Sequence, residues 1–142
     1  MTSVRHMGIV VSDMGKSLQF YRDLIGLQDA PVNEETGPFI DSLLDMPDAK
    51  IQTVKLAGEN SKTSIELLCF ESPPPKASTP LNTIGPTHVA LNVNDLDKLY
   101  TRLSEAQVPF NTPPHMSPDG CVKVAFCQDP DGTYIELVEL LK

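Results

Sequence analysis

An internal repeat constrains the fold of this chain more than any other feature of its sequence. Residues 6–17 (HMGIVVSDMGKS) match residues 88–99 (HVALNVNDLDKL) at an offset of 82 residues. A second match, at an offset of 70, lays residues 65–67 over residues 135–137, and both segments read Ile-Glu-Leu. Because the matched segments come in the same order in both halves, the sequence predicts a module that occurs twice.

Proline marks the expected boundary between the two halves. Residues 72–86 hold five of the 13 prolines of the chain. Proline fixes φ and lacks the backbone N–H that a sheet needs, so we expect this stretch to be an extended linker. The prediction is a single domain over residues 1–142, built from a first module (1–71), the linker and a second module (87–142).

Hydrophobic periodicity predicts the elements of each module. Apolar and polar residues alternate over 4–11 and 88–93, as in strands with one buried face. Asp13 and Asp95 follow these strands as N-caps of helices, the first of which runs to about Leu24. Further strands are expected at residues 51–57, 63–70, 121–127 and 133–140. Each half therefore reads β-α-β-β, with room for one more strand, which predicts an α+β fold of paired βαβββ modules.

Composition limits the partners of the chain. With 11 Lys and Arg against 19 Asp and Glu, the net charge is −8, which disfavours nucleic acids and anionic membranes. The three cysteines form no CxxC pair and the N-terminal segment lacks a signal-peptide pattern, so we expect a cytoplasmic protein. Several cations are scattered without forming a phosphate clamp: Arg5, Arg22, Lys55 and Lys62.

Strand alternation predicts where four chemically active side chains lie. Successive side chains of a strand point to opposite faces, and the apolar set of each strand must face its helix. One His and one Glu of each half then lie on the opposite face: His6 and Glu66, His88 and Glu136. Gly8 and Ala90 follow the histidines at two residues and leave room above them. Two imidazoles and two carboxylates make a suitable donor set for a divalent transition metal.

One apolar cluster is not explained by this pattern. It follows Gly37-Pro38 and comprises Phe39, Ile40, Leu43, Leu44 and Met46. As a short helix, it is interpreted as a lid, a dimer contact or ordinary packing.

Three segments resemble the vicinal oxygen chelate superfamily, the family of glyoxalases, bleomycin resistance proteins and extradiol dioxygenases. They are HMGIVVSDMGKSLQFYRDLIGLQ (6–28), THVALNVNDLDKL (87–99) and FCQDPDGTYIELVE (126–139). The resemblance implies paired βαβββ modules that form an open, barrel-like cup around one divalent metal ion: Zn, Ni, Co, Mn or Fe. It also implies a homodimer that binds a small-molecule substrate.

The donor set resembles the glyoxalase I branch most closely. That resemblance implies His6, Glu66, His88 and Glu136 as metal ligands, and a lyase or isomerase that acts through a metal-chelated enediolate. Glu66 and Glu136 would be the catalytic carboxylates. Two positions that contact glutathione in this branch are occupied here by Val10 and Phe70, so glutathione is not implied as the thiol.

Three alternatives remain open at this point. The first is an isomerase resembling methylmalonyl-CoA epimerase, although that branch has Gln at the position of Glu66. The second is a non-haem iron extradiol dioxygenase that uses only His6, His88 and Glu136. The third is a resistance protein that binds a small molecule without chemistry.

Overall fold

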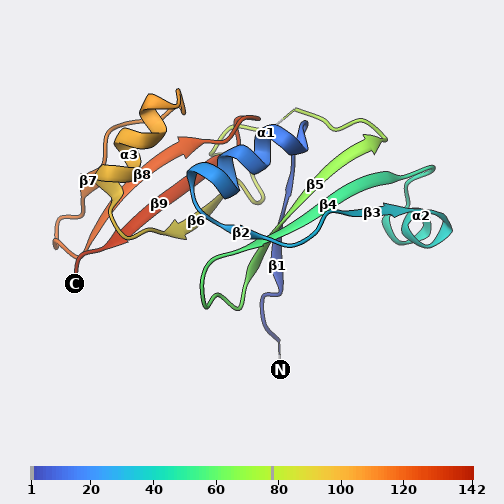
Figure 1. Cartoon of the computed structure of the whole chain (residues 1–142), viewed down its shortest axis with the longest axis horizontal. Coiled ribbons are helices and arrows are strands. Elements are labelled where there is room, and N and C mark those ends of the chain that lie inside the picture. Colours follow the sequence, from blue (N-terminus) through green and yellow to red (C-terminus); the bar gives the residue numbers. More distant parts are fainter. Residues whose placement is uncertain (1, 78) are drawn as a thin grey trace. The chain divides into compact units, whose positions relative to one another are not determined.

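Two separate sheets organise the chain. The computed structural model describes residues 2–77 and 79–142 (Figure 1). The chain divides into unit 1, Met1–Ala77, and unit 2, Ser78–Lys142. Each unit carries one sheet together with its own helices, which confirms the α+β class.

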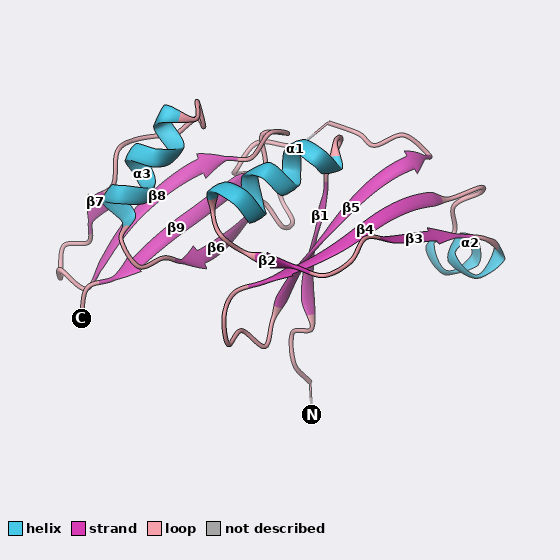
Figure 2. Cartoon of the chain, in the orientation of Figure 1, coloured by secondary structure: helices cyan, strands magenta, loops and turns pink. Residues whose placement is uncertain are grey.

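Unit 1 has a mixed sheet in the order β1-β5-β4-β2, with β3 also paired to β4. Strand β1 runs parallel to β5, and the pairs that involve β4 are antiparallel (Figure 2). The elements of the unit, in chain order, are β1 (His6–Val10), α1 (Met14–Leu18), η1 (Gln19–Leu24), β2 (Gln28–Asp29), β3 (Asn33–Thr36), α2 (Pro38–Leu44), β4 (Lys50–Ala57) and β5 (Ser64–Ser72).

Unit 2 has the sheet order β6-β9-β8-β7. Its elements are β6 (His88–Asn92), α3 (Leu96–Glu105), β7 (His115–Met116), β8 (Val122–Gln128) and β9 (Tyr134–Leu140). This is a βαβββ module. Unit 1 follows the same plan, with β3 and α2 as an insertion before β4. The paired-module prediction is therefore confirmed, including the additional strand in each half.

The core of each unit lies between its sheet and its helix. Helix α1 contacts β5, and α3 contacts β8 and β9. On the helix side of the last strands, Ile65 and Leu67 of β5 and Ile135 and Leu137 of β9 are buried. Fully buried members include Tyr21, Leu56 and Leu67 in unit 1, and Leu96, Leu103, Ile135 and Leu137 in unit 2.

Both helices begin as the sequence predicts. The carboxylate of Asp13 accepts a hydrogen bond from the backbone N–H of Lys16 at 3.0 Å. The carboxylate of Asp95 accepts one from Lys98 at 3.1 Å. Each cap satisfies one N–H that a helix leaves without an internal partner.

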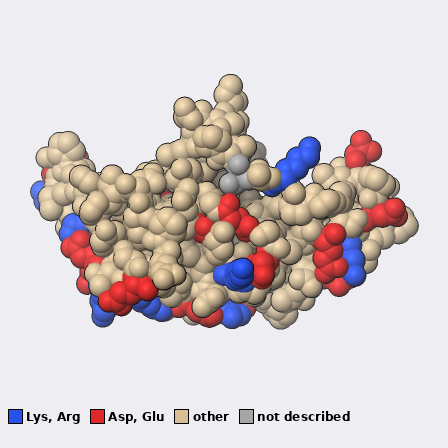
Figure 3. All heavy atoms as spheres, turned by 90° about the horizontal axis from the view of Figure 1, so that it is seen from above, with Lys and Arg blue, Asp and Glu red and all other residues tan. Residues whose placement is uncertain are grey.

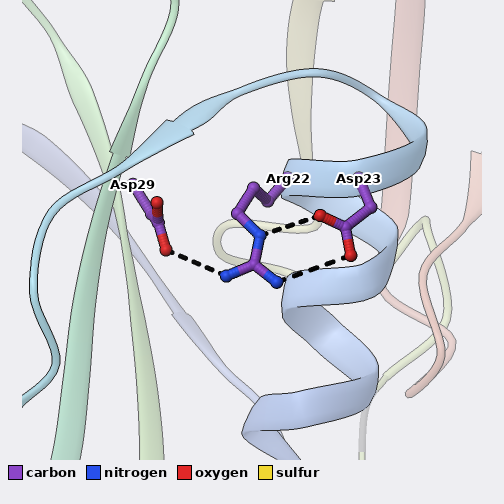
Figure 4. A network of polar contacts seen from close by, with 3 residues as sticks. All are labelled: Arg22, Asp23 and Asp29. Carbon is purple, nitrogen blue, oxygen red and sulfur yellow. Dashed lines mark hydrogen bonds and ion pairs between the residues drawn. The ribbon is translucent and has the colours of Figure 1, made fainter.

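The first helix changes character after Leu18. Residues Gln19–Leu24 form a π-helical turn instead of continuing the expected α-helix. Arg22 in this turn binds Asp23 at 2.8 Å and reaches Asp29 of β2 at 3.1 Å (Figure 4). The hydrogen bond with Asp23 is the main cause that raises the pKa of Arg22 and lowers that of Asp23. Arg22 therefore links the helix to the sheet edge.

Helix α2 accounts for the unexplained apolar cluster only in part. Ile40 packs with Ala49 and Ile51, and Leu68 and Phe70 of β5 join this cluster. Phe39 and Leu43, by contrast, are 76% and 64% exposed. Ile40 of α2 thus serves ordinary packing, whereas Phe39 and Leu43 of the same helix lie on the surface.

Candidate metal centre

The first predicted pair lies on adjacent parallel strands of unit 1. We call the sheet face opposite α1 in unit 1, and opposite α3 in unit 2, the distal face. His6 is paired with Ser64, and Gly8 is paired with Glu66. His6 and Glu66 therefore share the distal face, two positions apart along neighbouring strands. Their neighbours Ile9, Ile65 and Leu67 are buried on the helix side.

The imidazole of His6 contains a polar atom without a partner. Its Nδ1 is buried and makes no hydrogen bond within the described residues. A buried polar atom in this state costs about 1–3 kcal/mol. Next to it, a Cβ added at Gly8 would lie 3.3 Å from Cδ1 of Leu68. The space above His6 is therefore narrow on the strand side, and the imidazole retains an unused ligating nitrogen.

The second pair repeats this arrangement in unit 2. His88 is paired with Tyr134, and Ala90 is paired with Glu136, on parallel strands. Nε2 of His88 lies 3.4 Å from Oε2 of Glu136. The hydroxyl of Thr87 lies 3.2 Å from the other ring nitrogen, Nδ1. The two side chains remain accessible, since 39% of His88 and 24% of Glu136 are exposed.

Each unit alone offers only half of a usual metal site. Within residues 2–77 and 79–142, no three His, Cys, Asp or Glu side chains stand close enough to hold a metal ion. A transition-metal site usually takes three or four protein ligands. One imidazole and one carboxylate per unit, with an unpartnered nitrogen on His6, fit a divalent transition metal in donor chemistry.

Two residues beside these pairs escaped the sequence prediction. Phe126 of β8 is paired with Glu136, and its ring centroid lies 5.3 Å from that of His88 at an angle of 64°. Lys55 of β4 is paired with Glu66 in the same way. The sequence could identify Phe126 and Lys55 as partners of Glu136 and Glu66 only if the register of each hairpin were known.

The buried thiol of unit 2 is not part of the candidate site. Cys127 is fully buried, and burial is the main cause that raises the pKa of its thiol to about 12. It is paired with Ile135 and so lies on the helix side, away from Glu136. Cys127 is therefore a protonated packing residue at neutral pH, as its apolar setting favours.

The charged surface contains no broad basic field on the face that Figure 3 presents. Lys and Arg stand in small groups beside Asp and Glu. Two lysines of the described residues form close ion pairs: Lys123 binds Asp97 at 2.7 Å and Lys50 binds Glu71 at 3.0 Å. None of the helices in the described parts of the chain is long and apolar enough to cross a membrane.

Comparison with known proteins agrees with this architecture. The model of the Glyoxalase/Bleomycin resistance protein/Dioxygenase superfamily matches residues 3–137. The uncharacterized protein YwkD of Bacillus subtilis (strain 168) is 30% identical over 142 residues, covering 96% of each chain. A probable lactoylglutathione lyase of Synechocystis is 28% identical over 139 residues, covering 94% of this chain and 92% of the relative.

Solved structures show the same fold. A glyoxalase family protein from Bacillus cereus superposes with a TM-score of 0.90 at 20% identity, covering 100% of this chain and 96% of the other. The match of the family model extends over both units, including the His and Glu positions of β1, β5, β6 and β9. The chain belongs to the Glyoxalase/Bleomycin resistance protein/Dioxygenase superfamily.

Proposed function

We propose that the chain is a divalent-metal-dependent lyase or isomerase that acts on a small molecule with two neighbouring oxygen atoms. The observation that carries this proposal is the identical register of two His–Glu pairs. In both units the Glu is paired with the residue two positions after the His, on parallel strands. If these strand faces were only solvated, we would not expect both units to carry the same two residue types at the same register.

Four side chains would hold the metal ion: His6, Glu66, His88 and Glu136. When bound, the ion supplies Lewis acidity, which makes a proton on carbon next to a carbonyl easier to remove. These four ligands come from one unit 1 and one unit 2. The two units would belong either to the same chain or to the two chains of a homodimer. We expect a homodimer. Sedimentation of the metal-loaded protein tests the shared site, because a monomer that still holds the metal excludes it.

The carboxylates of Glu66 and Glu136 are the proposed proton carriers. A carboxylate takes the proton from one carbon and returns it to the neighbouring carbon, which requires reach to both. Their register partners Gly8 and Ala90 are the smallest residues, so neither adds a long side chain beside the carboxylates. Phe126 is the register partner of Glu136 and places an apolar ring on the same face as this carboxylate.

The substrate class we propose is a hemithioacetal or a related α-hydroxycarbonyl compound. The similarity to a probable lactoylglutathione lyase supports this class. Glutathione itself is not assigned, because Val10 and Phe70 occupy positions where the resemblance would require polar contacts.

Metal analysis tests the proposal directly. The protein is purified without chelator or affinity metal and compared with His6→Ala and His88→Ala. We expect about one Ni, Zn, Co or Mn per pair of units in the wild type and loss of metal in both variants. The matched control is His115→Ala, since His115 is the third histidine of the chain and Nδ1 of its ring lies 2.7 Å from the carbonyl oxygen of Pro113.

The outcomes separate the remaining candidates. Metal retained in His6→Ala or His88→Ala contradicts the proposal. Iron with oxygen consumption on catechols would favour a dioxygenase in its place. Tight binding of small molecules by metal-free protein, without turnover of hemithioacetals, would favour a binding protein.

A further inference from the structure

Lys55 lies on the distal face of unit 1, directly opposite Glu66. The two residues are register partners of the antiparallel strands β4 and β5. Side chains of such partners share one face, with Cβ atoms about 4.5–5.5 Å apart. The neighbours of Lys55 on its own strand, Val54 and Leu56, are each 1% exposed on the helix side. The ammonium group of Lys55 therefore belongs to the same face as His6 and Glu66.

The ammonium group of Lys55 is uncommitted. Lys50 and Lys123 are bound to Glu71 and Asp97. Among the residues that the structure describes, none forms an ion pair or hydrogen bond with the ammonium group of Lys55, Glu66 included. A lysine carries its charge on a flexible four-carbon stem and binds anions as a point charge. Lys55 is thus free to bind an anionic group that comes from outside the chain.

The fold does not require a cation at this position. The corresponding residue of unit 2 is Phe126, which is paired with Glu136 as Lys55 is with Glu66. The same place in the duplicated module accepts an aromatic ring that contacts His88. The module therefore does not need a positive charge at this position, and Lys55 is particular to unit 1.

We propose that the ammonium group of Lys55 binds a carboxylate of the substrate and selects substrates that carry a negative charge. The inference rests on the proposed function, because it takes the distal face as the substrate side. In a chain of net charge −8, a cation beside the metal ligands offsets the general repulsion of anions. Once Glu66 is engaged by the metal, the charge of Lys55 has no competing partner next to it.

Binding of metal-chelating probes tests this inference without any turnover. Protein loaded with Co²⁺ is titrated with the monohydroxamates of succinic and glutaric acid, and with the neutral butyric and valeric hydroxamates of equal length. We expect the carboxylate-bearing probes to bind about tenfold more tightly, as one hydrogen bond to a charged group provides. Lys55→Met removes this preference and Lys55→Arg retains it. Lys62→Met, a control in the loop before β5, leaves the preference unchanged.

The outcomes distinguish this inference from the proposed function. A wild type that takes up no Co²⁺ contradicts the proposed function and the inference with it. A wild type that takes up Co²⁺ but binds both probe types equally contradicts the inference alone. The same holds if Lys55→Met keeps the preference, or if it weakens neutral and anionic probes by the same factor.

Discussion

The two units share one backbone plan, but the side chains around their His–Glu pairs differ. In unit 2, His88 contacts Glu136, Phe126 and Thr87. In unit 1, Nδ1 of His6 has no partner among the described residues. The duplicated strands therefore preserve the register of the pairs, while the neighbours of the pairs have diverged.

This difference indicates a division of labour within the proposed site. The Phe126 ring gives unit 2 an apolar wall beside its carboxylate. Lys55 gives unit 1 a positive charge at the same place. The two modules therefore offer different surroundings to a bound group: a positive charge beside Glu66 and an aromatic ring beside Glu136. Variants in matched positions of the two units test this reading.

The largest expected effect is on the two carboxylates. Glu66→Gln and Glu136→Gln should each lower the turnover of a methylglyoxal hemithioacetal by about 10²–10⁴, the usual contribution of a general base. The measurement is kcat for the metal-loaded variants, with metal content determined on the same samples. Glu105→Gln, at the exposed end of α3, serves as the control.

The comparison of the two variants shows whether the units are equivalent in chemistry. Equal losses indicate that both carboxylates carry protons. A loss of turnover confined to Glu136→Gln, together with a lower metal content in Glu66→Gln, makes Glu66 a ligand only. Full turnover and full metal content in Glu66→Gln would contradict the four-ligand proposal.

The next effect concerns the matched cores. Leu67 and Leu137 occupy the same place in the Ile-Glu-Leu strands, and both are fully buried. Leu67→Ala and Leu137→Ala should each reduce the free energy of unfolding by about 3 kcal/mol. Denaturant unfolding measures this loss. Leu140→Ala is the control, because Leu140 is 65% exposed. A cost several times larger in one unit would mean that the two cores are not packed alike.

The sequence was sufficient for the features that follow from short-range rules. Alternation placed both His–Glu pairs on the faces opposite the helices, and Asp13 and Asp95 were identified as caps. These predictions need only the two-residue period of a strand and the N–H groups of a helix start. The π-helical turn after Leu18 was missed because it depends on how the helix meets the sheet.

Cross-strand neighbours were harder to predict for a physical reason. The partner of Glu66 depends on the register of the hairpin that joins β4 to β5. The turn in this hairpin, where the Ser61 N–H donates to the carbonyl of Gly58 at 3.2 Å, has no sequence signal as specific as Asp-Pro-Asp-Gly in unit 2. Lys55 was therefore seen only as one scattered cation. In unit 2 the Asp129 turn does fix the register, because its buried carboxylate accepts hydrogen bonds from Asp131 and Thr133, both at 2.9 Å. Phe126 could have been placed from that turn.

A smaller effect is expected at the helix caps. Asp13→Ala and Asp95→Ala should each cost about 1 kcal/mol of stability, since each leaves one helix N–H without its acceptor. Asp→Asn at either position should cost much less, because the amide oxygen still accepts. Thermal or denaturant unfolding provides the measurement.

The two caps also differ in one respect that a variant can expose. The start of α3 in unit 2 has a second acceptor besides Asp95. The carboxylate of Glu139 accepts a hydrogen bond from the backbone N–H of Leu96 at 2.7 Å. The corresponding residue of unit 1 is Cys69, whose thiol donates to the carbonyl of Ser12 at 3.7 Å instead. Glu139→Ala should therefore destabilise the start of α3 further, whereas Glu139→Gln should retain the contact. Equal stability of the two Glu139 variants would contradict this role.

The smallest expected effect comes from making unit 1 more like unit 2 at the position two residues after its histidine. Gly8→Ala introduces the residue found at position 90. The new Cβ would lie 3.3 Å from Cδ1 of Leu68, the end of a side chain that can move by a few tenths of an ångström. Alanine in a strand also lowers the entropy of the unfolded chain, which offsets the contact. We expect stability to change by less than about 0.5 kcal/mol. A much larger loss of stability would mean that the side chain of Leu68 cannot move. Position 8 would then require glycine because of its packing against Leu68, whereas position 90 of unit 2 accepts alanine.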